Sequence, residues 1–457
     1  MTETKHIAIV GAGLVGSLLS IYLAKRGYRV SVYERRLDMR KHVIEGGRSI
    51  NLALSNRGIR ALEQVGLAEM LKQNAIPMHG RMIHDEQGKL NLLPYGKTGQ
   101  FINSVSRSGL NIALMTEAEK HGVEFHFEHR CLNVDFKKNE LTLQEYEAVK
   151  HKTFDVIIGA DGAFSAVRGS MQFTDRFEYQ QSYIEHGYKE LRIPAGQDGN
   201  FLMEPNALHI WPRDSFMLIA LPNPDKTFTC TLFLPFEGAN SFEQLDSPES
   251  IDRFFKKFFP DAHEMMPTLQ EDFRDNPTSS LVTIRCYPWV RNKTLLIGDA
   301  AHGIVPFYGQ GMNAGFEDCR VLNDLLDEHG DKWKKVLPAF QTLRKPDADA
   351  IAQLALDNFV EMRDLVNDED FIIRKKIEAK LHERYPDKWI PLYSMVTFTD
   401  LPYSYALETG RLQDAIMKKV MKHIKTVEDY DKPEVQKLLE KQLVEKERLK
   451  GYQSQEV

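Results

Sequence analysis

The feature that most constrains this chain is a glycine-rich turn close to its start. A short, largely apolar run at residues 6–10 leads into Gly11-Ala12-Gly13-Leu14-Val15-Gly16. Residues 14–26 then carry apolar side chains at helical spacing, and residues 29–34 have the pattern of a second strand. A strand, a glycine turn, a helix and another strand make up a βαβ unit. The sequence therefore predicts a buried parallel sheet in a Rossmann-like α/β domain.

The three glycines of this turn have separate roles if a dinucleotide binds there. Gly11 permits the tight turn, Gly13 lets the backbone approach a pyrophosphate, and Gly16 lets the helix pack closely on the strand. Free N–H groups at the helix N-terminus would then face the phosphates. Glu34, which closes the second strand, would accept hydrogen bonds from ribose hydroxyls and repel a 2′-phosphate, which favours FAD or NAD over NADP. A tight turn without a ligand is the alternative.

A second glycine turn follows the strand-like run at residues 154–158. It reads Gly159-Ala160-Asp161-Gly162, so a carboxylate stands where the backbone can approach a ligand. Ser165 could instead be an ordinary cap of the next helix. Taken alone, this turn is equally compatible with a ligand site and with a structural turn.

A third turn follows the run at residues 294–297. Asp299 ends that strand, in position to bond a polyol, and a glycine-rich stretch up to Gly315 opens a helix. Free N–H groups at this helix start can stabilise negative charge, such as that of a reduced flavin. His302, taken alone, is more typical of a packed structural histidine.

The pattern changes between these turns, which predicts the domain organisation. Alternating apolar segments at 207–211, 216–221 and 227–234 indicate antiparallel strands, and the chain is helical from about residue 312. We expect a Rossmann-like FAD-binding domain over residues 1–180 and 286–375, interrupted by a sheet-rich substrate domain over 181–285. C-terminal helices should occupy 376–457. Residues 410–450 have the pattern of a solvated amphipathic helix, with a membrane-surface helix as the alternative.

Composition excludes several other classes of protein. The 457 residues, 42% of them hydrophobic, suit two or three domains, and a net charge of −6 argues against a nucleic-acid partner. The four cysteines form no CxxC pair, so we expect neither a metal site nor a disulfide. The chain reaches a strand within its first residues, and no apolar run approaches the roughly 20 residues of a membrane helix. We expect a cytoplasmic protein.

Together, in this order and spacing, the three turns resemble the class A flavoprotein aromatic hydroxylases, whose archetype is p-hydroxybenzoate hydroxylase. The resemblance covers roughly residues 5–360. It implies tightly held FAD, NADPH that visits transiently, and a sheet-rich domain over the substrate. Asp299 would then bind the ribityl chain, and the turn at residues 309–313 would lie beside the isoalloxazine. The cofactor-binding residues that it implies are Gly11, Gly13, Val15, Gly16, Glu34, Arg35, Arg36, Ala53, Arg107, Leu132, Asp161, Asp299, Gly311, Met312 and Asn313.

A narrower resemblance, to the kynurenine hydroxylases of this class, extends to about residue 410. It is carried by runs at residues 47–54, 80–84, 93–96, 186–191, 204–212, 228–233 and 391–398. It implies that Arg81 grips the carboxylate of L-kynurenine, because a guanidinium donates two parallel hydrogen bonds. Tyr95 would share this carboxylate, and Asn358 and Tyr403 would complete the polar end. The residues that would flank the aromatic ring are Leu208, Phe233 and Phe307.

Each of these residues also has a plainer interpretation. An isolated Arg81 could be a surface ion pair, and Phe233 could be sheet core. The mitochondrial relatives carry a C-terminal membrane anchor, whereas residues 440–457 here are charged and polar, so we expect a soluble form.

The resemblance also implies the reaction. NADPH reduces FAD, O2 then gives a flavin C4a-hydroperoxide, and oxygen is delivered to C3 of the ring. No catalytic side-chain base is expected, because the aromatic amine itself activates the ring. A hydroxylase of a phenol or of salicylate is the alternative. A halogenase is disfavoured because only Trp389-Ile390-Pro391 remains of the WxWxIP motif, and the later two turns argue against a plain NAD dehydrogenase or a non-catalytic nucleotide-binding module. The oligomeric state stays open.

Overall fold

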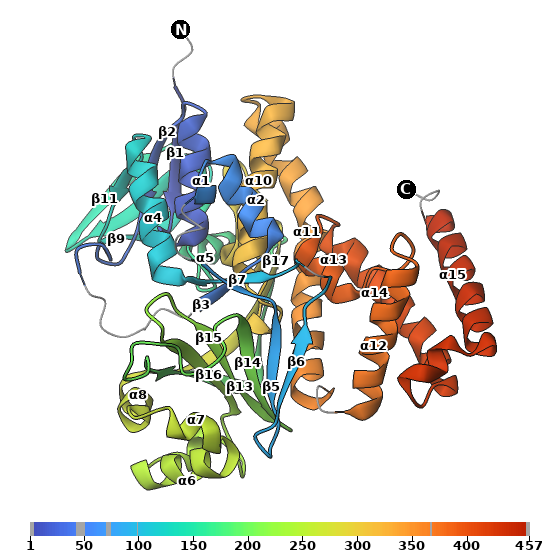
Figure 1. Ribbon diagram of the computed structural model, residues 1–457. Helices are drawn as coiled ribbons and strands as arrows, with labels where there is room; N and C mark the ends of the chain where they lie inside the picture. Colours follow the sequence, from blue (N-terminus) through green and yellow to red (C-terminus); the bar gives the residue numbers. More distant parts are fainter. Residues whose placement is uncertain (1–3, 43–50, 70–74, 98, 366–367, 454–457) are drawn as a thin grey trace.

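The computed structural model describes residues 4–42, 51–69, 75–97, 99–365 and 368–453. Figure 1 shows three regions: an α/β region that contains the N-terminus, a large sheet beside it, and a group of helices at the C-terminal end. Both the α/β class and the C-terminal helices agree with the prediction from the sequence.

The α/β region is built on a six-stranded sheet that is parallel except at one edge. In spatial order its strands are β18 (Val290–Arg291), β19 (Thr294–Leu296), β12 (Val156–Gly159), β1 (His6–Val10), β2 (Arg29–Tyr33) and β8 (Glu124–His126). Only β18 pairs antiparallel. Helix α1 (Leu14–Lys25) packs against α4 (Arg107–Lys120) and α10 (Gly311–His329). The predicted βαβ unit is therefore confirmed.

The register of this sheet brings the three glycine turns to one edge. Val10 pairs with Gly159, and Gly159 pairs with Leu296, so β1, β12 and β19 end side by side. Since ligands of parallel sheets bind beyond the carboxyl ends of the strands, this edge is where a dinucleotide site is expected.

The second large sheet has seven strands. In spatial order they are β17 (Thr278–Tyr287), β13 (Glu178–Ile193), β16 (Phe228–Pro235), β15 (Phe216–Pro222), β14 (Ala207–Arg213), β5 (Gly80–His84) and β6 (Leu90–Pro94). One face packs on α6 (Pro248–Phe258), α7 (Pro260–Glu264) and α8 (Leu269–Asp275). The three segments expected to be antiparallel strands are β14, β15 and β16. Two strands, β5 and β6, come from residues ahead of the segment 181–285.

Two small sheets and several short helices complete this part of the molecule. One small sheet consists of β3 (Asn51–Leu54), β7 (Ile102–Ser106) and β4 (Ala75–Met78), and another of β11 (Ala148–Thr153), β10 (Glu140–Glu145) and β9 (His129–Asp135). The short helices are α2 (Asn56–Gln64), α5 (Ala166–Gln172), α9 (Asp299–His302), η1 (Phe242–Gln244) and η2 (Pro306–Tyr308).

The C-terminal helices follow the long helix α11 (Trp333–Val360) and a π-helical turn, η3 (Glu361–Leu365). They are α12 (Glu369–Arg384), α13 (Leu392–Phe398), α14 (Tyr403–Val420), η4 (Met421–His423), η5 (Val427–Asp431) and α15 (Pro433–Gln453). The expected helix over 410–450 is thus interrupted at residues 421–432. Its apolar side chains pack into a separate core around Trp389, Met417 and Leu439, because α14 and α15 fold back on each other.

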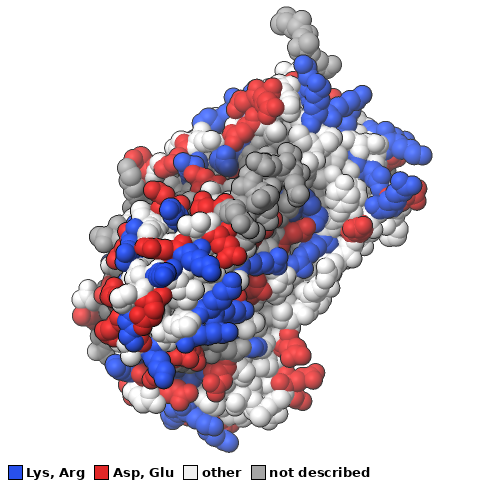
Figure 2. All heavy atoms as spheres, turned by 90° about the vertical axis from the view of Figure 1, so that its right-hand side faces the viewer, with Lys and Arg blue, Asp and Glu red and all other residues white. Residues whose placement is uncertain are grey.

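Basic and acidic side chains are mixed over the face that these helices present in Figure 2. Such mixing leaves no extended single-sign surface on this side of the molecule. Across the ranges that the structure describes, no helix is both long enough and apolar enough to cross a membrane.

Candidate active site

The first glycine turn has the geometry that its spacing predicts. Gly11 has φ +104°, and a Cβ there would lie 2.5 Å from the carbonyl oxygen of Ala160. A Cβ on Gly16 would lie 2.0 Å from the carbonyl oxygen of Gly11, so only glycine lets α1 approach this turn. Gly13, in contrast, is exposed, and a Cβ there would meet no atom within 4 Å. The open space lies where a pyrophosphate would need it.

Glu34 stabilises this turn from the neighbouring strand. Its carboxylate accepts hydrogen bonds from the N–H of Ala12 at 3.0 Å and from the N–H of Arg36 at 3.0 Å. The side chain is half-buried, so its remaining lone pairs can still accept from a ribose.

In the second turn, the Asp161 carboxylate accepts hydrogen bonds from residues that follow it closely in the chain. Asp161 accepts hydrogen bonds from the Ser165 hydroxyl at 2.5 Å and from the N–H of Ala166 at 2.6 Å. Burial raises the pKa of Asp161, and these hydrogen bonds oppose the shift. Ser165 caps α5 by accepting from the N–H of Arg168, which agrees with the structural alternative for that residue. The Arg168 guanidinium donates to Ala300 O at 2.9 Å and so joins the second turn to the third.

The third turn packs directly on the first. Val15 fills the space beside two glycines: a Cβ on Gly298 would lie 3.1 Å from Val15, and one on Gly315 only 2.5 Å. Asp299 is exposed at the start of α9, beside this contact. The third motif therefore presents a carboxylate next to the helix that would hold the pyrophosphate.

The turn ahead of α10 is fixed by Asn313. Its amide group donates to Ala53 O and Gly309 O, both at 2.8 Å, and its carbonyl oxygen accepts from the N–H of Ser55 at 2.9 Å. Gly309 adopts the left-handed conformation, with φ +66°. This side chain therefore holds the glycine-rich turn against β3.

These residues fit an FAD molecule. Neither Gly13, ahead of α1, nor Gln310, ahead of α10, makes a side-chain cap, so the N–H groups of both helix starts are left for phosphate or flavin oxygens. Among the remaining predicted cofactor residues, Ala53 is half-buried and Met312 buried, whereas four are exposed. These four are Arg35, Arg36, Arg107 and Leu132.

The predicted substrate residues Arg81 and Tyr95 lie together, and a second tyrosine joins them. The Arg81 guanidinium is 4.6 Å from the ring centroid of Tyr393 and 5.8 Å from that of Tyr95. The two tyrosine rings are stacked, with centroids 5.5 Å apart. Arg81 comes from β5 and Tyr393 from α13, so the large sheet and the C-terminal helices each contribute to this group.

The pKa values of Arg81, Tyr95 and Tyr393 are all raised. Burial alone would lower the pKa of Arg81, but Tyr393, Tyr95 and the carboxylate of Glu361 raise it above its usual range. Burial raises the pKa of both tyrosines, with Arg81 opposing the shift. The phenols therefore stay protonated and the guanidinium stays charged at neutral pH, which makes all three groups donors.

Two other predicted polar residues have different partners. The Asn358 amide donates to Phe307 O at 2.7 Å and fixes the loop that carries this ring. Tyr403 is fully buried, donates its hydroxyl to Gln310 at 2.9 Å, and has the Arg57 guanidinium 4.0 Å from its ring. The structure thus does not bring Tyr403 into the group around Arg81.

An apolar wall lies next to the polar group. Phe307 contacts Phe233 and Phe359, with ring centroids 4.9 Å and 4.2 Å apart. Leu208 packs at the border between this cluster and the one that contains Tyr95. The three predicted ring-flanking residues therefore share one apolar region, formed by the large sheet and the turn before α10.

Sequence reasoning missed Tyr393 and Glu361. Tyr393 lies in the run at residues 391–398 that carries the narrower resemblance, so the sequence contained a signal from which no role for Tyr393 was drawn. Glu361 begins the π-helical turn η3, and π-turns within helices are often functional. Tyr308 was also left without a role, and its ring stacks on Tyr393 with centroids 5.5 Å apart.

The structural interpretation of His302 is supported. The side chain is buried, and Nε2 lies 2.5 Å from the carboxylate of Asp318. All four cysteines are buried and free of disulfides, and within the described ranges no group of His, Cys, Asp and Glu could hold a metal ion.

Comparisons with known proteins support the FAD-binding assignment. The FAD binding domain family matches residues 4–355. The kynurenine 3-monooxygenase of Flavobacterium johnsoniae is 50% identical over 444 residues, which cover 96% of this chain and 99% of the relative. That of Myxococcus xanthus is 48% identical over 464 residues, which span the full length of both chains. Among solved structures, the tetrameric form of 2-methyl-3-hydroxypyridine-5-carboxylic acid oxygenase superposes with a TM-score of 0.67 at 22% identity. This match covers 80% of this chain and 94% of the other, and it supports the fold alone.

Proposed function

The chain belongs to the kynurenine 3-monooxygenase family of FAD-dependent monooxygenases, and we propose that it hydroxylates L-kynurenine to 3-hydroxykynurenine with NADPH and O2. The observation that carries the proposal is the group formed by Arg81, Tyr95 and Tyr393, beside the apolar wall of Phe233 and Phe307. An amino-acid carboxylate and an aromatic ring are the two ends of kynurenine, and this region offers a binding surface for each.

The polar end of the site suits the amino-acid part of the substrate. The Arg81 guanidinium and the two protonated phenols present only donors, which match the oxygens of a carboxylate. The Glu361 carboxylate raises the pKa of Arg81 and lies 3.4 Å from Lys375, and we propose that it also accepts from the substrate ammonium. Opposite charges at this end orient the amino acid in one direction.

The apolar end of the site suits the ring. Water would be excluded from the substrate ring by Leu208, Phe233 and Phe307. The Asn358 side-chain amide fixes the position of Phe307 by donating a hydrogen bond to the backbone carbonyl of Phe307. No side chain needs to act as a base, because the aromatic amine supplies electron density to the ring without losing a proton. The contribution of the protein is orientation, which restricts attack to one ring carbon.

The glycine turns would hold the FAD that supplies the activated oxygen once NADPH has reduced it. Gly13 and the start of α1 would take the pyrophosphate, Glu34 a ribose, and Asp299 the ribityl chain. The start of α10, which Asn313 fixes, would face the isoalloxazine.

Ligand titrations of the flavin absorbance test the proposal. The holoenzyme is compared with Arg81→Met, using L-kynurenine and kynuramine, the decarboxylated analogue. We expect Arg81→Met to keep its yellow flavin and to bind L-kynurenine at least tenfold more weakly, since a hydrogen bond to a charged group contributes about 1.5–3 kcal/mol. Binding of kynuramine should change little.

An unchanged dissociation constant for L-kynurenine in Arg81→Met would remove the carboxylate assignment. A wild-type enzyme that ignores L-kynurenine but binds salicylate or a simple phenol would move the substrate to another aromatic acid, with the flavin assignment intact.

A further inference from the structure

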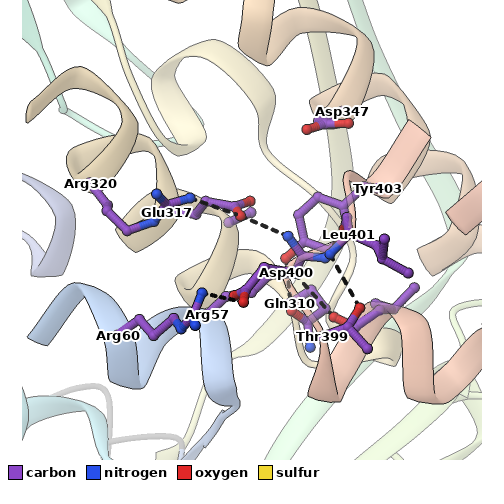
Figure 3. Close-up of polar contacts among 12 residues, drawn as sticks. Arg57, Arg60, Gln310, Glu317, Arg320, Asp347, Thr399, Asp400, Leu401 and Tyr403 are labelled. Carbon is purple, nitrogen blue, oxygen red and sulfur yellow. Dashed lines mark hydrogen bonds and ion pairs between the residues drawn. The ribbon is translucent and has the colours of Figure 1, made fainter. Parts of the chain in front are cut away.

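Arg57 lies outside the site described above, yet it contacts the helix that carries Tyr393. It is the second residue of α2, and its side chain is 1% exposed. Its Nε donates to Val396 O at 3.1 Å, and Nη2 donates to Leu401 O. Figure 3 shows Arg57 between Glu317 of α10 and the segment that contains Leu401 and Tyr403.

These contacts complete the C-terminal end of α13. The last four carbonyls of a helix have no partner within it. Here Thr399 donates to Met395 O at 2.6 Å, Arg57 to Val396 O, and Asn56 to Phe398 O at 3.1 Å. Two consecutive residues of α2 therefore cap the short helix that carries Tyr393.

The same end of α2 contacts the turn beside α10. Ser55, directly before Asn56, donates its N–H to Asn313, which fixes the 309–313 turn. Three consecutive residues, 55 to 57, thus connect the cofactor side of the site to the carboxylate side.

A second connection runs through buried charges. The Arg57 Nη1 donates to Glu317 at 2.7 Å, and the other oxygen of Glu317 lies 2.9 Å from Arg344. Arg344 donates to Asp318 at 2.8 Å, and Asp318 accepts from the N–H of Gly298 at 3.1 Å. Arg57 and Arg344 hold the pKa of Glu317 below its usual value against the effect of burial, so this chain of charges stays ionised. It ends at the turn that carries Asp299.

We propose that Arg57 is a positioning residue that couples the carboxylate site to the cofactor side. By capping α13 it fixes Tyr393 against Arg81, and through Glu317 and Ser55 it fixes α13 relative to the two turns that would contact FAD. Occupation of the carboxylate site is then linked to the position of the ring relative to the flavin. The inference rests on the proposed function for its substrate, but not for the link between α13 and the 309–313 turn.

Arg57→Lys is the informative substitution. It keeps the positive charge beside Glu317, but an ammonium cannot reproduce the planar set of donors that reaches Glu317, Val396 O and Leu401 O together. Asn56→Ala removes only the hydrogen bond to Phe398 O and, because Asn56 is exposed, leaves the core intact. Arg60→Lys is the matched control. Arg60 lies one turn further along α2 and pairs with Asp400 on the same C-terminal segment, but both side chains are largely exposed.

Ligand binding by the FAD-loaded variants, and the peroxide that they release per NADPH consumed, are measured first. Arg57→Lys should weaken L-kynurenine binding about tenfold, kynuramine binding less than twofold, and release more peroxide per NADPH consumed. Asn56→Ala should act in the same direction by about two- to threefold, and Arg60→Lys should match the wild type. Equal losses of affinity for both ligands would overturn the proposal, because a purely structural role does not distinguish a ligand with a carboxylate from one without it. Unchanged binding and unchanged peroxide release in Arg57→Lys and Asn56→Ala would overturn it as well.

Hydrogen–deuterium exchange without substrate is measured second. Arg57→Lys should accelerate amide exchange both in α13 and in residues 309–313, whereas Arg60→Lys should accelerate neither. Faster exchange in α13 alone would overturn the coupling. If the wild type fails to bind L-kynurenine, the proposed function falls, and this exchange result still decides the coupling.

Discussion

At the scale of single residues, the proposed carboxylate site depends on which of two tyrosines lies beside Arg81. Tyr393 and Tyr403 lie ten positions apart, each close behind a proline, and the sequence runs around them are similar. The two residues have different surroundings in the structure. The ring of Tyr393 stacks on Tyr95 beside Arg81. The Tyr403 hydroxyl donates a hydrogen bond to Gln310, and the Arg57 guanidinium lies over the Tyr403 ring. The two hydroxyls should therefore affect different properties of the enzyme.

Tyr393→Phe is expected to weaken L-kynurenine binding by about tenfold, because it removes a hydrogen bond to a charged carboxylate. Its melting temperature should stay close to that of the wild type. Tyr403→Phe should instead cost roughly 1 kcal/mol of stability, through the lost buried hydrogen bond to Gln310. Calorimetry and ligand titration of both variants check this, and a larger loss of binding in Tyr403→Phe would reverse the assignment.

Gly13 and Gly16 make a second pair of contrasting residues. Gly16→Ala should prevent folding of the turn, since its Cβ would overlap Gly11 O, whereas Gly13→Ala should fold and bind FAD weakly because its methyl group occupies only the space of the pyrophosphate. Gly169, within α5, also has open space around it, so Gly169→Ala serves as the control that keeps FAD. The ratio of flavin to protein absorbance reports the result, and full FAD content in Gly13→Ala would show that the pyrophosphate does not occupy the space beside Gly13.

At the scale of elements, local patterns predicted the strands and turns well, and pairings between distant segments poorly. The glycine turn at residues 11–16 could be predicted because its constraints are local: one glycine needs positive φ and another needs close packing. The parallel pairing of β5 with β14 joins segments far apart in the chain, and no local pattern reveals it. The capping of α13 by Arg57 was missed for the same reason, because α2 carries no motif and the carbonyls of α13 that it caps lie more than 300 residues away.

An element-scale prediction concerns the junction of β5, β14 and α7. His209 bonds His84 at 2.8 Å and Glu204 O at 2.8 Å, and His84 bonds Asp261 at 2.7 Å. Burial lowers the pKa of His209 from 6.5 to about 4. Between these two pH values the imidazole is protonated in the unfolded chain and neutral in the folded chain. Stability should thus fall with decreasing pH between 6.5 and about 4, by up to about 1.4 kcal/mol per unit.

Urea unfolding at a series of pH values measures this dependence. His209→Gln should flatten the slope within that window. Trp211→Phe, which loses the indole hydrogen bond to Asp261 but no titrating imidazole, should lower stability at every pH and keep the slope. Equal slopes in the wild type and in His209→Gln would contradict the assignment.

At the scale of the whole molecule, the C-terminal helices have their own core and also supply Tyr393 to the site. Leu439 of α15 is fully buried in that core, whereas Val444 of the same helix is 68% exposed. This tail was predicted as a solvated helix because composition and spacing reveal an apolar face but not what covers it. Figure 1 shows α12 to α15 gathered on one side of α11, and α13 packs on α14, so loosening this core should also affect α13.

Leu439→Ala is expected to cost about 2–5 kcal/mol in this core and to accelerate hydrogen exchange in residues 369–453, with β1 and β2 unaffected. Val444→Ala should leave exchange unchanged. Exchange that rises equally in the six-stranded sheet would show that the C-terminal core is not a separate cooperative unit.

Hydroxylation of L-kynurenine by this flavoprotein is best tested through the stoichiometry of the reaction. Purified holoenzyme is mixed with NADPH and L-kynurenine in air, and NADPH loss, 3-hydroxykynurenine and peroxide are measured together. We expect L-kynurenine to accelerate NADPH loss and one 3-hydroxykynurenine to form for nearly every NADPH consumed. Rapid NADPH loss with peroxide and no hydroxylated product, or no response to L-kynurenine, would contradict the proposed function.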